Sequence, residues 1–182
     1  MHEDHELMEL VKQGDKLAYE MLVHRYRKTG IAFAYSIIRD EYLAEDIVQD
    51  CFVQIYIRRE QYRSIYTFKT YLFTLIRNRS IDYYRREKHN QNIENIDPNL
   101  LCSVESIENT IIERESIRHI HEQMEQLKGD YKQILYLYAV EDLSYEQIAK
   151  VMRQTKAQVK IKLYRARQKL KLLREGGECL EK

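Results

Sequence analysis

Hydrophobic and polar residues alternate with helical spacing over most of the chain. Near the C-terminus, apolar residues recur at steps of four and three and form one stripe: Val159, Leu163, Ala166, Leu170 and Leu173. The opposite face is basic, and residues 156–174 contain no acidic side chain. The pattern therefore predicts an amphipathic helix that packs through its stripe and leaves a positively charged face free.

A short helix directly before this one completes a helix-turn-helix. Ser144 with Gln147, and Thr155 with Gln158, fit the S/T-x-x-E/Q capping box, in which hydroxyl and amide satisfy backbone N–H groups at a helix start. Two adjacent helix starts are therefore predicted, the second opening a recognition helix. A basic helix also suits a surface without any ligand, but the capped helix in front favours DNA binding.

The segment LAEDIVQDCFVQIYIRR predicts another amphipathic helix, with an acidic outer face. Its apolar positions form a broad face, made of Leu43, Ala44, Ile47, Val48, Cys51 and Ile55. Asp46, Gln49 and Asp50 group on the outside at i, i+3 and i+4. Since acidic side chains repel nucleic acid, this face predicts a basic protein partner. From the pattern alone, a merely solvated face is an equal alternative.

Aromatic and basic residues alternate through the next segment, from Glu60 to Lys88. The aromatic members are Tyr62, Tyr66, Phe68, Tyr71, Phe73, Tyr83 and Tyr84. The basic members are Arg63, Lys69, Arg77, Arg79, Arg85, Arg86 and Lys88. Unpaired bases stack on rings while the backbone follows positive charge, so the mixture favours single-stranded nucleic acid. Phe68, Leu72, Leu75 and Ile76 also fit the core of a helix, and that interpretation is preferred for those four.

A change of composition divides the chain. Residues 89–110 are rich in Asn and acidic residues, contain the only proline, Pro98, and lose helical periodicity. Beyond them, Ile117 to Leu127 predict a helix that Gly129 ends, and Asp130 opens the next one. We expect an all-α fold with two small helical domains, residues 1–88 and 111–182, joined by a flexible linker at 89–110.

Composition excludes several classes of protein. In 182 residues, 30 basic and 29 acidic side chains give a net charge of +1. No apolar run approaches the roughly 18 residues that span a bilayer, and the polar start is unlike a secretion signal. Three scattered cysteines predict neither disulfides nor zinc, so a cytoplasmic location is expected. No phosphate loop or nucleophile motif is present, so we expect no catalysis, cofactor, metal or small-molecule substrate.

Three motifs together resemble a known family. They are LAEDIVQDCFVQIY followed by TFKTYLFTLIRNRSIDYYRR, then LKGDYKQILYLYAVEDLSYEQIAKVM, and VKIKLYRARQKL. In this order they are similar to the extracytoplasmic function (ECF) sigma factors of bacterial RNA polymerase, over nearly the whole chain. The resemblance implies two domains, region two and region four, and a function in promoter recognition and melting. It also implies core RNA polymerase, promoter DNA (double-stranded and melted) and an anti-sigma factor, which can be membrane-anchored, as partners.

The resemblance also implies roles for individual residues. The core-polymerase contact would be made by Asp46, Gln49, Asp50 and Phe52. The minus-ten element would be bound by Tyr62, Arg63, Phe68, Lys69, Tyr71, Arg77, Asn78, Asp82 and Arg85. The minus-thirty-five element would be read by Lys156, Gln158, Lys160, Lys162 and Arg165.

Some positions depart from the family pattern. Tyr71 stands where Trp is usual, Arg153 replaces the common turn glycine, and Ile161 with Lys162 replaces a Ser-Arg pair. A side chain at a left-handed turn costs roughly 1 kcal/mol. Ile161 can contact a thymine methyl group but cannot donate a hydrogen bond, which alters the expected promoter preference. Two other functions are compatible with the pattern: a stand-alone helix-turn-helix regulator, and a helical adaptor or anti-sigma protein.

Overall fold

The structure is a computed structural model that describes residues 3–63, 65–91, 127 and 129–177, with side chains described as far as Glu87 in the first part and Leu172 in the last. The described residues contain helices and no strands. The elements are α1 (Asp4–Lys12), α2 (Lys16–Ile38), α3 (Glu41–Ile57), the 3-10 turn η1 (Arg59–Gln61), α4 (Phe68–Gln91), α6 (Gly129–Ala139), α7 (Tyr145–Met152) and α8 (Lys156–Gly177). The all-α prediction is confirmed. None of the described helices is long and apolar enough to cross a membrane.

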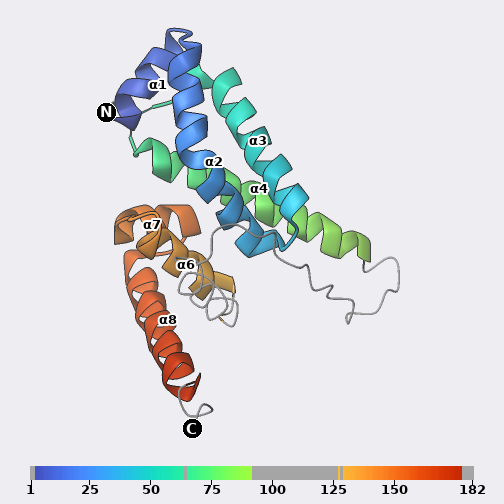
Figure 1. Cartoon of the computed structure of the whole chain (residues 1–182), viewed down its shortest axis with the longest axis vertical. Helices are drawn as coiled ribbons and strands as arrows, with labels where there is room; N and C mark the ends of the chain where they lie inside the picture. The colour runs from blue at the N-terminus through green and yellow to red at the C-terminus, as the bar shows by residue number, and fades with distance from the viewer. Residues whose placement is uncertain (1–2, 64, 92–126, 128, 178–182) are drawn as a thin grey trace, which may run out of the picture.

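The first unit is built from α1 to α4, and side chains at their ends fix where these helices begin. Asp15 accepts hydrogen bonds from the N–H groups of Leu17 and Ala18 and so caps α2. Asp40 accepts one from Leu43 at 2.9 Å and caps α3. Arg39, between α2 and α3, adopts a left-handed conformation that turns the chain back on itself. The result is the antiparallel pair α2 and α3, with α4 crossing beneath them (Figure 1).

The core of this unit forms where α2, α3 and α4 meet. Phe33 of α2 packs edge-on against Phe73 of α4, with ring centroids 5.2 Å apart. At Gly30, an added Cβ would lie 3.1 Å from Ile76 Cδ1 and 3.3 Å from Val48 Cγ1, so α3 and α4 both approach α2 closely there. Glycine is needed at this position because its missing side chain permits the close approach.

The second unit consists of α6, α7 and α8, and contains the predicted helix-turn-helix. Both capping boxes are present: Ser144 and Gln147 exchange bonds of 3.3 and 2.8 Å, and Thr155 and Gln158 exchange bonds of 3.2 and 2.8 Å. Val159, Leu163 and Ala166 of the predicted stripe are buried. Leu170 is partly buried, and the side chain of Leu173 lies outside the described part. The apolar stripe of α8 is therefore confirmed over its described positions.

The two units are in contact with each other. Helix α7 lies against α4, and α6 lies against α2, while α8 runs away from the first unit (Figure 1). The linker was expected at residues 89–110, but residues 89–91 are the last residues of α4. The rest of the expected linker, and the helix expected from Ile117, lie outside the described residues, except for the buried Leu127. Gly129, expected to end that helix, is the first residue of α6.

Candidate functional site

The acidic face of α3 is exposed and is held in place by α4. Asp46, Gln49 and Asp50 all lie on the surface. Arg79 of α4 donates to Asp50 Oδ2 at 2.8 Å, and its Nε and Nη2 donate to Gln54 Oε1 at 3.3 and 2.9 Å. One guanidinium therefore links two polar residues of α3 across the helix pair. The sequence shows Arg79 only as one cation of its segment, because spacing along one helix cannot reveal partners on another.

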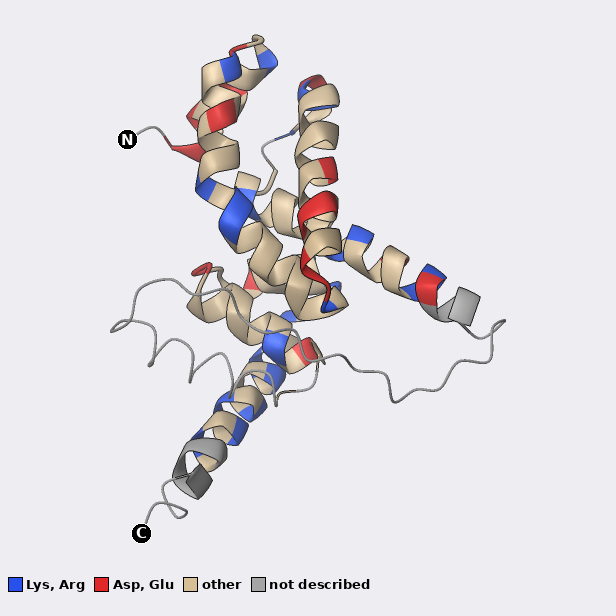
Figure 2. Cartoon of the chain, turned by 45° about the vertical axis from the view of Figure 1, so that its right-hand side comes forward, with Lys and Arg blue, Asp and Glu red and all other residues tan. Residues whose placement is uncertain are grey.

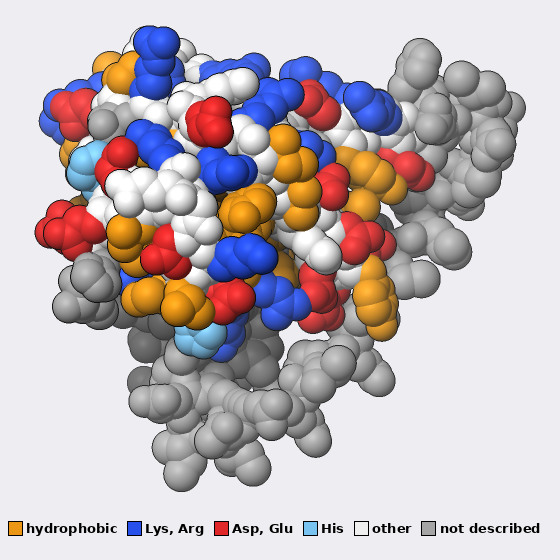
Figure 3. Space-filling view, turned by 90° about the horizontal axis from the view of Figure 1, so that it is seen from above, with side chains coloured by type: hydrophobic (Ala, Val, Ile, Leu, Met, Phe, Trp, Pro, Cys, Tyr) orange, Lys and Arg blue, Asp and Glu red, His pale blue; other side chains and the backbone are white. Residues whose placement is uncertain are grey.

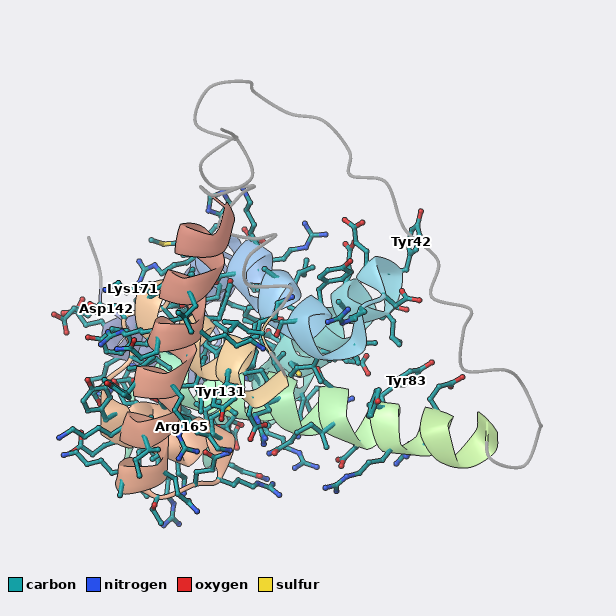
Figure 4. The ribbon with its side chains drawn as sticks, turned by 90° about the horizontal axis from the view of Figure 1, so that it is seen from below. Tyr42, Tyr83, Tyr131, Asp142, Arg165 and Lys171 are labelled. Atoms are coloured by element: carbon teal, nitrogen blue, oxygen red, sulfur yellow. The ribbon has the colours of Figure 1, made fainter. Side chains whose placement is uncertain are left out.

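An open groove of about 430 Å³ separates this part of α3 from α4. Its lining comes from both helices: Leu43, Asp46, Ile47 and Asp50 from α3, and Arg79, Asp82, Tyr83 and Arg86 from α4. Tyr42 and Tyr83 project on this side of the molecule, at a distance from α8 (Figure 4). Two of the residues expected to bind polymerase and one expected to bind the minus-ten element thus meet at one groove.

Three aromatic residues assigned to binding surfaces lie in the core instead. Phe52 is 3% exposed, Tyr62 6% and Phe68 1%. Each ring completes the packing of the first unit, and Tyr62 contacts both Phe68 and Tyr71. Burial raises the pKa of the Tyr62 hydroxyl to about 12. In this conformation these three side chains support the surface from inside, which is the interpretation that the sequence analysis preferred for Phe68.

The remaining minus-ten residues on α4 divide between two sides of the helix. Tyr71, Asn78, Asp82 and Arg85 are spaced by seven, four and three residues and share one face. Lys69 and Arg77 lie on a different side, and both contact the second unit: Lys69 bonds to Glu141 and Arg77 to Gln133. The expected set is therefore not one continuous surface.

The loop before α4 adds exposed side chains that the sequence did not single out. Arg63 is exposed, as predicted for a contact residue, and Ile65 beside it is 72% exposed. Ile65 was not singled out in the sequence analysis, because a lone apolar residue carries no periodic signal. An exposed apolar side chain next to Tyr66 suits contact with an unstacked base.

Helix α8 presents most of the predicted recognition residues to solvent. Lys156, Gln158, Lys160 and Arg165 are exposed. Arg165 is visible on α8 in Figure 4. Lys162 is partly buried and bonds to Asp130, which also accepts from Gln154 at 3.1 Å. Ile161 is 51% exposed on the same helix, so its apolar side chain is available to a DNA base.

Besides Lys162, two more of these recognition residues already have partners within the second unit. Lys156 forms an ion pair with Glu146, and the hydrogen bond from Lys156 holds the pKa of that carboxyl below its usual value. The carbonyl oxygen of Gln158 accepts the Thr155 N–H in the capping box. The side-chain amide NH2 group of Gln158 is left to donate to a base, and its oxygen keeps one lone pair.

Charge is distributed unevenly over the two units. Figure 2 shows Lys and Arg along the length of α8, and Asp and Glu gathered on α3. On the face seen from above, by contrast, side chains of both signs are interspersed with hydrophobic ones (Figure 3). Among the described residues, no group of three or more His, Cys, Asp or Glu could hold a metal ion.

Comparison with known protein families matches both units. Residues 22–90 match the family Sigma-70 region 2, and residues 117–170 match Sigma-70, region 4. The ECF RNA polymerase sigma-E factor of Haemophilus influenzae is 32% identical over 176 residues, which cover 91% of this chain and 92% of that protein. The chain belongs to the ECF sigma factors.

Other relatives of this ECF sigma factor agree with that conclusion. The ECF RNA polymerase sigma factor SigM of Bacillus subtilis is 29% identical over 163 residues, covering 88% of this chain and 98% of the relative. Among solved structures, the sigma factor RpoE of Bartonella quintana in complex with the anti-sigma factor NepR has a TM-score of 0.70 at 20% identity, covering 86% and 96% of the two chains. CnrH in complex with the cytosolic domain of CnrY has a TM-score of 0.68 at 21% identity, covering 95% and 97%. The sigma factor's family is one of transcription initiation factors rather than of enzymes.

Proposed function

We propose that this ECF sigma factor binds core RNA polymerase through the exposed acidic face of α3 and directs it to promoters through α4 and α8. The observation that carries the proposal is the separation of charge: an outward acidic face on the first unit, and a helix without acidic residues from 156 to 174 on the second. The acidic face suits a basic protein surface, and the basic helix suits the phosphate backbone.

The minus-ten element would be bound by two parts of the first unit. Tyr71, Asn78, Asp82 and Arg85 offer a ring, an amide and charged groups along one face of α4. The loop with Arg63 and Ile65 adds a cation and an exposed apolar side chain. Stacking on rings is worth about 1–3 kcal/mol per base, which offsets part of the cost of unpairing the duplex.

The minus-thirty-five element would be read by α8 in the major groove. Gln158, Ile161 and Arg165 would face base edges, and Lys156, Lys160 and Lys162 would face phosphates. The NH2 group of Gln158 suits an acceptor on a base. Ile161 suits the methyl group of thymine.

The setting follows from these partners. The sigma factor would work in the cytoplasm, where polymerase and promoter DNA are found, and it would catalyse no reaction itself. An anti-sigma factor is a further proposed partner, because a sigma factor of similar fold, RpoE of Bartonella quintana, has been solved in complex with the anti-sigma factor NepR.

Run-off transcription tests the proposal directly. Core polymerase would transcribe a library of genomic fragments with and without this chain, and the transcript starts would be sequenced. New starts that share two short upstream motifs at fixed spacing are expected. Absence of new starts despite polymerase binding would favour an adaptor, and duplex binding without polymerase binding would favour a stand-alone regulator.

Charge reversal tests the polymerase contact separately. Asp46→Lys should weaken binding to core polymerase by about tenfold or more, because it places a like charge against a basic partner. Glu20→Lys, at an exposed position of α2, makes the same change of charge and serves as the control. Equal affinity of the two variants would contradict the assignment of the α3 face.

A further inference from the structure

We propose that region four of this chain competes with promoter DNA for the minus-ten surface. In the free chain, α6, α7 and the turn between them cover the surface around Thr67, Lys69 and Arg77. This inference rests on the proposed sigma function and on the minus-ten contact that the family resemblance implies for Lys69 and Arg77. The competing surface belongs to the same chain, so its effective concentration is set by the linker rather than by the concentration of the protein.

The central contact joins Lys69 of α4 to Glu141 in the turn after α6. Lys69 Nζ donates to the Glu141 backbone carbonyl at 2.7 Å and lies 3.5 Å from Oε2 of its carboxylate. Glu141 is only 3% exposed, and its other oxygen, Oε1, has no hydrogen-bond partner. A buried carboxylate needs a nearby cation, so this turn depends on Lys69 for its stability.

Further contacts surround this pair on α4 and on the loop before it. Arg77 Nε donates to Gln133 Oε1 of α6 at 3.3 Å, and Gln147 Nε2 of α7 donates to Thr67 Oγ1 at 3.1 Å. Lys150 of α7 lies over the ring of Tyr66, 4.7 Å from its centroid. Region four therefore contacts two cations, a hydroxyl group and an aromatic ring that could otherwise bind the phosphates and bases of a melted strand.

An apolar contact anchors the same interface on α2. Tyr136 of α6 is 5% exposed, its ring lies 5.9 Å from that of Phe33, and its hydroxyl donates to the Thr29 carbonyl at 2.9 Å. The interface thus combines a desolvated ring with charge-assisted bonds, which is the composition of a specific contact. It leaves α8 outside, where its basic face stays exposed.

The contact is incompatible with simultaneous reading of both promoter elements. Two elements centred about 25 base pairs apart are separated by roughly 85 Å along the duplex at 3.4 Å per pair. Each unit of this chain is about 20–30 Å across, and here they touch. Region four must therefore leave the first unit before both elements can be bound, and its departure uncovers Lys69 and Arg77.

Glu141→Lys tests the proposal, with Asp142→Lys as the matched control. The first variant places a second cation against Lys69 in a buried position, whereas the second makes the same charge change at the next, exposed residue. Asp142 has a φ of 52°, a conformation that Arg39 and Arg153 also adopt, so a long basic side chain is acceptable there. Thermal unfolding of both variants verifies that each is folded.

Two measurements on the full chain are compared. Small-angle X-ray scattering should show a radius of gyration a few Å larger for Glu141→Lys than for wild type or Asp142→Lys. Fluorescence anisotropy with a labelled mixed-sequence single-stranded 20-mer should show about tenfold tighter binding for Glu141→Lys than for Asp142→Lys. Any non-specific effect of the added charge is the same in both variants.

The outcomes separate this inference from the proposed function. Equal radii, or equal affinity of the two variants for the single strand, would overturn the inference. Binding of core polymerase by the wild-type chain is measured in the same preparations. Its absence would contradict the sigma function, whereas the radius of gyration would still report whether region four leaves the first unit.

Discussion

Among the described non-glycine residues, Arg39, Asp142 and Arg153 have a positive φ, and each lies at a turn. Arg153 ends α7 with φ 52° and ψ 46°, and its N–H bonds to the carbonyls of Ala149 and Lys150. The sequence predicts this position because the family places glycine there, and the left-handed conformation is confirmed. The turn keeps its geometry with arginine, at an energetic cost to the fold.

Replacing that arginine should relieve the cost. Arg153→Gly is expected to raise the free energy of unfolding by up to about 1 kcal/mol, because glycine adopts the left-handed region without a steric penalty. Urea unfolding followed by circular dichroism measures the change. Arg153→Ala retains the penalty, and an equal gain from alanine would show that the backbone conformation is not the cause.

Lys132 of α6 gives the stability of the chain a dependence on pH. Its side chain is buried, and desolvation, followed by repulsion from Arg39, lowers its pKa to about 8. The unfolded chain holds that proton up to pH about 10.4. Between these values the unfolded state binds more protons, so the contribution of Lys132 to stability rises with pH.

The predicted rise of stability with pH can be checked by comparing the wild type with Lys132→Met. The melting temperature of the wild type should rise relative to that of the variant by about 5 °C or more between pH 7.5 and pH 10. The comparison cancels the contributions of other groups. Cys51 is one of them, because its thiol titrates in this range in the unfolded chain, whereas burial raises its pKa to about 12 in the fold. A constant difference between the two proteins across this range would contradict the prediction.

At the level of elements, local sequence patterns predicted where helices begin and which face of a helix is buried. They did not predict which helices contact one another. Both capping boxes and the stripe of α8 follow from spacing within one helix, and the structure confirms them. The burial of Phe52 was not predicted, because the same helical spacing suits a core ring and a contact ring. The opposite sides taken by Lys69 and Asn78 follow from their separation of nine residues, but the side that the second unit covers depends on contacts that the sequence of α4 does not contain.

The link between α3 and α4 yields a prediction about Arg79. Arg79→Ala should weaken core-polymerase binding by about threefold, because Asp50 and Gln54 lose the group that orients them. Since the Arg79 and Asp50 side chains are 40% and 65% exposed, the cost in stability should stay below about 1 kcal/mol.

Surface plasmon resonance with immobilised core polymerase measures the change in affinity. Arg86→Ala is the control, since Arg86 lines the same groove from α4. If Arg86→Ala weakened binding as much as Arg79→Ala, the effect would belong to the charge of the groove and not to the bonds that Arg79 makes.

At the scale of the whole molecule, two surfaces for nucleic acid differ in their availability. The basic face of α8 is exposed, while Lys69 and Arg77 of α4 contact the second unit. Salt dependence of duplex binding by the free chain should therefore report mainly on α8. Removing one cation that binds a phosphate lowers the slope of log affinity against log salt by about 1.

Lys160→Ala should lower this slope for binding to a DNA duplex. The duplex would carry a promoter identified by run-off transcription. The measurement is anisotropy at several salt concentrations, and the expected result is uniformly weaker binding with a slope smaller by about 1. Lys16→Ala removes an exposed cation at the start of α2 and should leave the slope unchanged. A slope that changes equally in both variants would place the duplex elsewhere on the molecule.

The close approach of three helices at Gly30 bears on how this gene can vary. Any heritable change to a larger residue must be accommodated by Ile76 and Val48, which already lie within van der Waals contact of that position. Alanine at position 30 therefore requires these side chains to move by a few tenths of an ångström, and a smaller residue at position 76, such as Val, would provide the room. In related sequences, a larger residue at position 30 of α2 should therefore occur together with a smaller residue at position 76 of α4.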